Sequence, residues 1–216
     1  MIAVLSAGLA PAFALLSYFY LKDRVTEPLS LIVKTFLLGA LLVFPIMFIQ
    51  YALSTENITN NEFIHSFLYI AFLEEFFKWF IFMFSIYYHS EFDDHYDGIV
   101  YAVSISLGFA SVENILYLLT NGIEYAFLRG FFPVSSHALF GVIMGYYFGR
   151  AKITEYHTNW NRAYALFIPL LLHGTYNYIL ITVKSNWIYY LIPFMIFLWF
   201  FALHRIKAAN QSSTNI

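Results

Sequence analysis

The sequence predicts an all-α fold, a polytopic membrane helix bundle with about seven transmembrane helices. Of its 216 residues, 61% are hydrophobic and only 11% are charged, whereas soluble domains carry about 45–50% apolar and about 25% charged residues. One small core cannot hide that much apolar surface, so lipid must cover part of it. The aromatic content of 22% suits packed membrane helices and their interfaces. We therefore expect one integral membrane domain over residues 1–216, with the lipid bilayer as a partner.

Seven apolar stretches are each long enough to cross a bilayer as a helix, which takes roughly 20 residues for a ~30 Å hydrocarbon core. They cover residues 2–21, 31–53, 64–88, 98–119, 131–149, 163–183 and 187–204. Polar or helix-breaking segments separate them, and a polar tail is predicted at 205–216. The first stretch is expected to be a retained span and not a cleaved signal, because its first basic residues, Lys22 and Arg24, follow the apolar run.

Within the fifth stretch, Gly141, Gly145 and Gly149 recur every four residues. This spacing places them on one helical face and predicts a close approach by a neighbouring helix.

The basic residues predict an orientation with the N-terminus outside and the C-terminus inside, because cytoplasmic loops carry an excess of Lys and Arg. With this orientation the outer side receives only Arg129 and Lys184. The inner side receives Lys22, Arg24, Lys34, Arg150, Lys152, Arg162, Arg205 and Lys207. The net charge of −2 argues against a nucleic-acid partner, since no basic patch exists to neutralise phosphates. The chain has no cysteine, which excludes disulfides and thiol catalysis.

Charged side chains stand roughly halfway along the third predicted span, where they are costly and usually mark a functional site. Glu74 and Glu75 are adjacent, and Lys78 follows four and three residues later. On a helical surface Lys78 can reach either carboxylate. A structural ion pair that joins helices is the alternative interpretation.

Three further spans carry polar side chains that add to this group. Glu113 lies in the fourth span and His137 in the fifth, while His173 and Asn177 are one turn apart in the sixth. At 1.5 Å per residue, these residues and Glu75 lie about 9–17 Å below the outer ends of their spans. We therefore expect one polar layer in the outer half of the membrane, within reach of water.

The residue types restrict the chemistry to water activation. Only Ser135 and Ser136 lie near a histidine, at the start of a span, so acyl-enzyme chemistry is not favoured. No aspartate lies inside a span and no His-Glu-x-x-His occurs. A glutamate that activates water, with His and Asn donors to an oxyanion, is one alternative. A metal held by His137, His173 and Glu75 is the other. No cofactor is expected, and zinc stays open.

The order of these motifs along the chain resembles the PrsW family of glutamate-dependent intramembrane proteases. The motifs are Glu74-Glu75-x-x-Lys78, Asp97-Gly98 leading to Gly108-Phe109-Ala110-x-x-Glu113-Asn114, His137-x-x-x-Gly141 and His173-Gly174-x-x-Asn177. The resemblance covers a motif-bearing core of about residues 64–183. The family is distantly similar to CAAX-type membrane proteases, whose second motif ends in His where Glu113 stands here.

The resemblance implies regulated intramembrane proteolysis in a bacterial cell membrane. The expected partner is a single-pass anti-sigma factor, cut near its extracytoplasmic side (site-1 cleavage) to start release of a sigma factor in a stress response. We expect Glu75 to be the general base and Glu74 its partner, with exchangeable roles, and Lys78 to tune the pair. The expected oxyanion donors are His173 and Asn177.

His137 and Glu113 are expected to orient water or shuttle protons, supported by Phe109 and Asn114. A proton-coupled small transporter or channel is the rival interpretation, because intramembrane Glu and His chains also serve proton relays. A non-catalytic assembly or immunity factor is the third.

Overall fold

The computed structural model describes residues 1–56, 59–154 and 157–212, and this part of the chain is helical with turns and short loops between the helices. The long helices are α1 (Ile2–Leu21), α2 (Leu29–Thr55), α4 (Leu73–Ser85), α5 (His95–Asn121), α7 (Ser135–Ile153), α8 (Thr158–Thr182) and α9 (Trp187–Ser212). Shorter helical pieces are α3 (Glu62–Ile64), η1 (His65–Phe72), η2 (Ile123–Tyr125), α6 (Ala126–Arg129) and η3 (Gly130–Val134).

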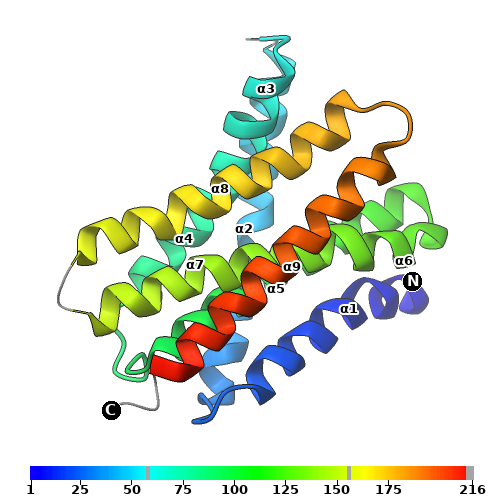
Figure 1. Cartoon of the computed structure of the whole chain (residues 1–216). Coiled ribbons are helices and arrows are strands. Elements are labelled where there is room, and N and C mark those ends of the chain that lie inside the picture. Colours follow the sequence, from blue (N-terminus) through cyan, green and yellow to red (C-terminus); the bar gives the residue numbers. More distant parts are fainter. Residues whose placement is uncertain (57–58, 155–156, 213–216) are drawn as a thin grey trace.

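These pieces form seven helical passes, which confirms the predicted all-α membrane bundle. The third pass is α3, η1 and α4 in series, and the fifth runs from α6 through η3 into α7. Within the described residues, six helices are long and apolar enough to cross a membrane. The third pass is not among them because it carries Glu74, Glu75 and Lys78. Successive passes alternate in direction, so the start of α1 and the end of α9 lie at opposite ends of the bundle (Figure 1).

Helix α5 lies at the centre of the bundle. In an 18-residue apolar stretch of α5, 78% is buried inside the bundle, whereas the corresponding share for α1 is 17%. Helix α5 packs against α7, α2 and α1, and α7 in turn packs against α8 and α9. The peripheral helices expose apolar side chains such as Phe48 and Phe200 on their outer surfaces, as lipid-facing helices do.

Close contact between α5 and α7 depends on the glycine repeat that the sequence predicts as a packing face. A Cβ added at Gly145 would lie 2.1 Å from the carbonyl oxygen of Gly98, and one added at Gly98 would lie 2.4 Å from that of Gly145. Only residues without a side chain allow two helix backbones to approach this closely. The prediction of a close helix approach at Gly145 is confirmed.

Two segments of π-helix interrupt the passes, and each ends just before predicted site residues. Segment η1 leads into α4, which begins at Leu73 immediately before Glu74. Segment η3 contains Pro133, which has no N–H to donate, and leads into α7 two residues before His137. Wide turns of this kind are frequent at functional sites because they re-aim the residues that follow.

Several helices extend beyond the predicted spans. The fifth pass begins at Ala126 and ends at Ile153, whereas the prediction covers 131–149. Helix α9 continues to Ser212, through most of the predicted tail 205–216. The Arg205 guanidinium lies 5.0 Å from the ring centre of Tyr146 on α7, and Ala209 is fully buried. Residues 213–216 lie outside the described residues.

Candidate active site

Two carboxylates and an ammonium group lie together at the start of α4. Glu74 is 4% exposed, and Glu75 and Lys78 are 0% exposed. Lys78 Nζ donates to Glu75 Oε1 over 2.8 Å and lies 3.6 Å from Glu74 Oε2. Buried charges of this kind persist only when they are paired, and the i, i+3 and i, i+4 spacings supply the pairing.

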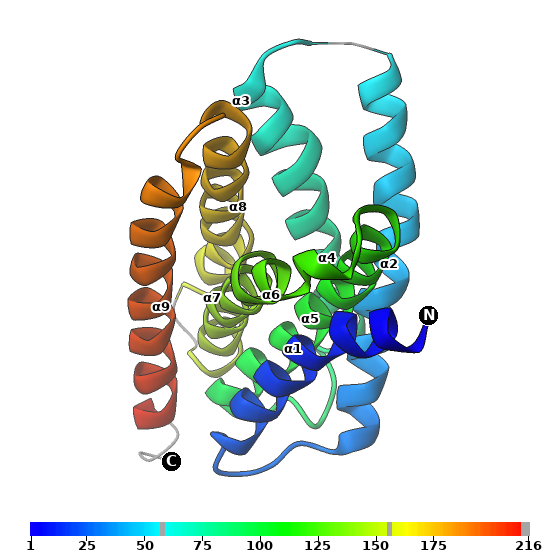
Figure 2. The same cartoon turned by 90° about the vertical axis from the view of Figure 1, so that its right-hand side faces the viewer.

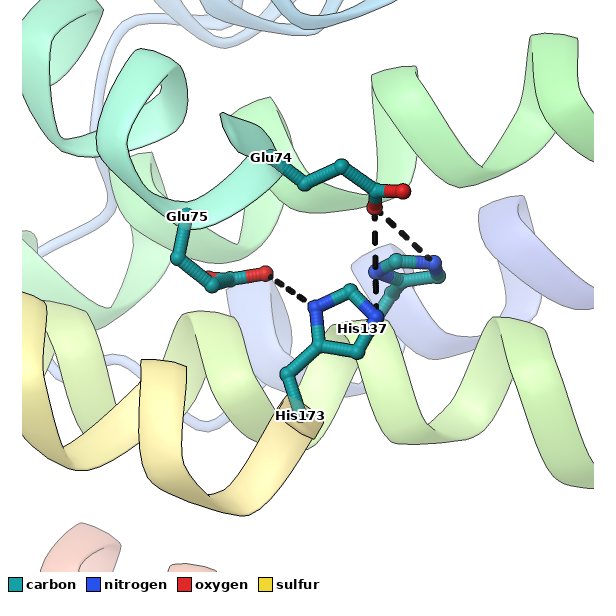
Figure 3. A group of neighbouring side chains, drawn as sticks. All are labelled: Glu74, Glu75, His137 and His173. Carbon is teal, nitrogen blue, oxygen red and sulfur yellow. Dashed lines mark hydrogen bonds and ion pairs between the residues drawn. The ribbon is translucent and has the colours of Figure 1, made fainter. Parts of the chain in front are cut away.

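His173 on α8 joins this group through both of its ring nitrogens (Figure 3). Its Nδ1 lies 2.9 Å from Glu75 Oε1, and its Nε2 lies 3.9 Å from Glu74 Oε2. Since a carboxylate accepts hydrogen bonds, Nδ1 carries the hydrogen and donates it to Glu75. Glu75 therefore orients the ring so that Nε2 faces Glu74. The ring of Phe140 stacks on His173 at 4.9 Å and fixes this orientation.

His137 on α7 closes the group from the opposite side. Its Nδ1 lies 3.1 Å from Lys78 Nζ, and its Nε2 lies 3.2 Å from Glu113 Oε2 and 4.0 Å from Glu74 Oε2. An ammonium group only donates hydrogen bonds, so Nδ1 accepts from Lys78 and Nε2 carries the hydrogen. His137 therefore donates to Glu113. The Lys78 ammonium also lies 4.4 Å from the ring centre of Phe109, a cation–π contact.

Glu113 on α5 forms the more open edge of the cluster, with 35% of its side chain exposed. Arg129 at the end of α6 places Nη2 3.7 Å from Glu113 Oε2. Asn114 accepts from Arg129 Nε over 3.3 Å and donates to the Gly8 carbonyl over 3.1 Å. Asn114 therefore ties Arg129 to α1 and, among the described residues, forms no hydrogen bond with Glu74 or Glu75.

Gln50 on α2 donates from Nε2 to Glu74 Oε1 over 3.2 Å. It lines a cavity of ≈ 310 Å³ between α2 and η1. A second cavity of ≈ 390 Å³ shares Ser54, His65 and Tyr69 with the first and reaches Asn61 ahead of α3. At this end α2 and α3 stand apart (Figure 2). The two cavities lead from this end of the bundle to the residue that holds Glu74.

Most of the predicted site residues meet in this cluster, and two, Asn114 and Asn177, form no hydrogen bond with its carboxylates or histidines in the described part of the chain. Glu74, Glu75, Lys78, His137, His173, Glu113 and Phe109 are brought together from α4, α5, α7 and α8. Asn177 follows His173 by one turn, and its Nδ2 is buried without a hydrogen-bond partner in the described part of the chain.

Sequence reasoning missed Gln50, Arg129 and Phe140. Gln50 could have been found as a polar side chain in an apolar span, and Arg129 as one of only two basic residues on the predicted outer side. Phe140 follows His137 by three residues within its own motif, but an aromatic residue gives no signal in a chain this rich in them.

Taken together, the fold and the site define a polytopic membrane protein with a hydrolase-like centre of carboxylates and histidines inside its helix bundle. Residues 27–203 match the profile of the family described as "PrsW family intramembrane metalloprotease", and the chain belongs to this family. It is a multi-pass membrane peptidase, and this membership sets aside the transporter and scaffold interpretations.

Relatives named "Protease PrsW" match nearly the whole chain. The relative from Oceanobacillus iheyensis is 63% identical over 216 residues, covering 99% of both chains. The relative from Bacillus subtilis is 56% identical over 98% of this chain and 97% of its own. A more distant one, from Clostridioides difficile, is 32% identical over 90% of this chain and 86% of its own. No solved structure matches the chain.

The donor set of the site fits a metal ion in type and in spacing. Glu74, Glu75, His137 and His173 each offer a ligand atom, and these atoms lie within 4.8 Å of one another. Glu74 Oε2 has no hydrogen-bond partner in the described part of the chain and lies near the Nε2 atoms of both histidines. Two histidines and one glutamate are a known zinc ligand set. Glu75 is already engaged by Lys78 and His173, which favours Glu74 as the carboxylate ligand.

The charges of the cluster do not cancel. Glu74, Glu75 and Glu113 carry three negative charges, and Lys78 and Arg129 carry two positive ones. One negative charge is left inside the bundle, where uncompensated charge is strongly disfavoured. A proton held within the cluster or a bound metal cation would offset it.

Proposed function

We propose that this peptidase performs site-1 cleavage of a single-pass membrane anti-sigma factor, near the extracytoplasmic side of the membrane. The observation that carries the proposal is the position of His173 in the half of α8 nearer its predicted outer end, Thr182, with Glu74 beside it near the middle of the third pass. The cavities that lead to Gln50 start from that same side. The motif resemblance supplies the substrate class.

In this mechanism Glu74 is the general base and Glu75 positions His173, which is the exchange of roles that the sequence leaves open. Glu74 Oε2 accepts no hydrogen bond from the described residues, so it can take a proton from water and later deliver it to the leaving amine. Glu75 Oε1 is occupied by Lys78 Nζ and His173 Nδ1. A proton on His173 then leaves Nε2–H free to donate to the oxyanion of the tetrahedral intermediate.

A zinc ion, where bound, would be held by Glu74, His137 and His173 and would supply Lewis-acid activation of the water and of the peptide carbonyl. For this, the hydrogen of His137 must move from Nε2 to Nδ1. Because Nδ1 then carries a hydrogen, it can no longer accept one from Lys78. Lys78 would then donate to the two carboxylates alone. The metal-dependent and metal-independent alternatives therefore differ in the hydrogen bond between Lys78 and His137.

The first test is a cleavage assay in bacterial membranes that contain a tagged single-pass anti-sigma factor and one variant of this protein. We expect Glu74→Gln to abolish the extracytoplasmic cleavage product. His173→Ala should lower its rate by about a hundredfold or more, as loss of an oxyanion donor does. Glu124→Gln, which changes an exposed carboxylate of η2, is the matched control and should cleave normally. Equal cleavage by all variants would assign the cut to another protease.

The same membranes, treated with a chelator, decide between the two forms of water activation. Unchanged cleavage supports activation by Glu74 alone. Complete loss of cleavage that only added zinc restores would overturn that form and support the metal held by Glu74, His137 and His173.

A further inference from the structure

We propose that a pocket beside the Glu113–Arg129 pair receives a large apolar side chain of the substrate next to the bond that is cleaved. We call it the aromatic pocket. Its lining comes from α5, η2, the end of α6, η3, α8 and α9, and most of the lining side chains are aromatic or aliphatic. They include Tyr117, Tyr125, Arg129, Tyr176, Leu180 and Trp187. This inference rests on the proposed peptide cleavage at Glu74 and His173, and it adds a determinant of specificity.

The size and lining of the aromatic pocket suit a side chain. Its volume is ≈ 300 Å³, at the lower limit of small-molecule pockets, which span about 300–1,000 Å³. The walls are aromatic or aliphatic except for the hydroxyls of the tyrosines and the guanidinium of Arg129. Phenylalanine or leucine side chains bury most of their surface in such a pocket, whereas alanine leaves it largely empty.

Two polar groups of the pocket, the Tyr176 hydroxyl and Arg129 Nη2, have no hydrogen bond of good geometry among the described residues. Tyr176 is 4% exposed, and its hydroxyl has no partner of good geometry in the described part of the chain. The hydroxyl of Ser136, which lies near it, is donated to the Pro133 carbonyl over 2.8 Å. Arg129 Nη2 is buried without a hydrogen-bond partner among the described residues, and its ion pair with Glu113 Oε2 at 3.7 Å is longer than a hydrogen bond. Buried donors left unpaired are unfavourable, so the occupant is expected to bring an acceptor, and a peptide carbonyl is the acceptor that accompanies every substrate side chain.

The pocket adjoins the catalytic cluster through Arg129. Arg129 lines it and lies 3.7 Å from Glu113 Oε2, which in turn lies 3.2 Å from His137 Nε2. A side chain in the pocket would therefore hold its own backbone beside Glu113. Gln50 and its cavity flank Glu74 on the side of α2, so the substrate has contacts on both sides of the cluster. An extended segment in a membrane needs hydrogen-bond partners of this kind.

A lipid chain fits the walls but not the donors. An acyl chain would fill the apolar volume but offer no acceptor to the Tyr176 hydroxyl, and it would leave Arg129 Nη2 with its 3.7 Å ion pair to Glu113 and no hydrogen bond. A lipid phosphate would have to compete with Glu113 for Arg129. A peptide segment with a large apolar side chain meets both requirements, because the side chain contacts the apolar lining and the backbone carbonyl accepts hydrogen bonds from the two donors.

The test uses any single-pass reporter that the wild type cleaves, whether or not it is an anti-sigma factor, after the cleaved bond has been mapped. Each residue that flanks the bond is changed in turn to Ala, Leu or Phe. We expect one position at which Phe or Leu is cleaved at least about tenfold faster than Ala, as apolar pockets discriminate. Leu180→Trp, which fills the pocket, should remove or reverse that preference. Leu171→Trp is the matched control, because Leu171 lies on the same helix and is 57% exposed.

Docking can be read without cleavage, because the chain has no cysteine. Leu180→Cys in a Glu74→Gln background should form a disulfide with a single cysteine of the reporter at that one position. Leu171→Cys should form none there. An unchanged preference in Leu180→Trp, or no disulfide from Leu180→Cys to a reporter that the wild type cleaves, overturns the proposal. A phospholipid that copurifies with the wild type but not with Leu180→Trp, at unchanged preference, also overturns it.

Failure of the pocket and failure of the proposed substrate class are separable. A wild type that cleaves other reporters but no anti-sigma factor contradicts the proposed substrate, and the Leu180→Trp comparison still decides the pocket. A wild type that cleaves anti-sigma factors with the same preference as Leu180→Trp contradicts the pocket alone.

Discussion

Lys78 is the cation that makes two adjacent carboxylates tolerable inside the bundle. Its ammonium group faces Glu75 at 2.8 Å, His137 Nδ1 at 3.1 Å and Glu74 at 3.6 Å. Each of its three hydrogens therefore has an acceptor nearby. Lys78 therefore links Glu74 and Glu75 of α4 to His137 of α7.

Replacing Lys78 with methionine should destabilise the protein by about 3–5 kcal/mol, because it leaves Glu75 buried without its cation. The thermal midpoint of unfolding in detergent measures this. In Lys78→Met/Glu75→Gln the stranded charge is gone, so this double variant should be more stable than Lys78→Met alone. Effects of the two changes that simply add would contradict the pairing.

The sequence predicts the identity of the site residues better than their contacts. Glu74, Glu75, Lys78, His137 and His173 are conspicuous because ionisable groups are rare in apolar spans. Which nitrogen of His173 faces which carboxylate depends on how α8 packs against α4, and no spacing within one helix contains that information. Gln50 and Arg129 stand out as polar residues of the sequence, but no spacing predicts that they contact Glu74 and Glu113.

At the scale of elements, hydropathy predicts the passes and not their irregularities. The first predicted span, 2–21, coincides with α1, because its ends coincide with a clear change of composition. The two π-helical segments were not predicted, since η1 contains neither proline nor glycine and its wide turn arises from packing. Both segments nevertheless decide where α4 and α7 aim their first residues.

Because α5 and α7 are in close contact, we expect one methyl group added at Gly145 to lower the stability of the protein. Gly145→Ala places a Cβ 2.1 Å from a backbone oxygen of α5, so the helices must separate, at a cost of about 1–3 kcal/mol or more. A lower thermal midpoint checks this. Gly130→Ala is the control, because its Cβ would meet only side-chain atoms of Pro11 at 3.2 Å and 3.3 Å and should change the midpoint little. Equal effects of both changes would refute the close approach.

The loop between α1 and α2 predicts a dependence of stability on pH. One carboxylate oxygen each of Asp23, Glu27 and Asp97 lies within 4.8 Å of the other two. Burial raises the pKa of Asp23 from 3.8 to about 6, and burial also raises the pKa of Glu27. The folded state thus binds these protons more tightly than the unfolded state, so this stabilisation is present at low pH and is lost as the pH rises through about 6.

Asp23→Asn removes that titration and should raise the thermal midpoint more at pH 7.5 than at pH 5. Glu56→Gln, an exposed acid at the other end of α2, should shift the midpoint equally at both values. A shift from Asp23→Asn that is the same at pH 5 and pH 7.5 would contradict the raised pKa.

For the whole molecule, the odd number of passes links the orientation in the membrane to the side from which the site is reached. Seven passes put the termini on opposite sides, and the positive-inside bias predicts that the N-terminus is outside. The cavities that lead to Gln50 and the aromatic pocket both lie toward the predicted outer ends. The orientation therefore decides whether a substrate is cut on its extracytoplasmic side.

Single cysteines in this cysteine-free chain test orientation and access together. Ser54→Cys, at the outer end of α2 and in the lining of both cavities, should react in intact cells with a maleimide that cannot cross the membrane. Glu91→Cys, in the loop ahead of α5, should react only after permeabilisation. Because the attached group fills the cavities, labelled Ser54→Cys should also lose cleavage, whereas labelled Glu91→Cys should retain it. The reverse labelling pattern would place the catalytic cluster in the cytoplasmic half and would remove the basis for extracytoplasmic cleavage.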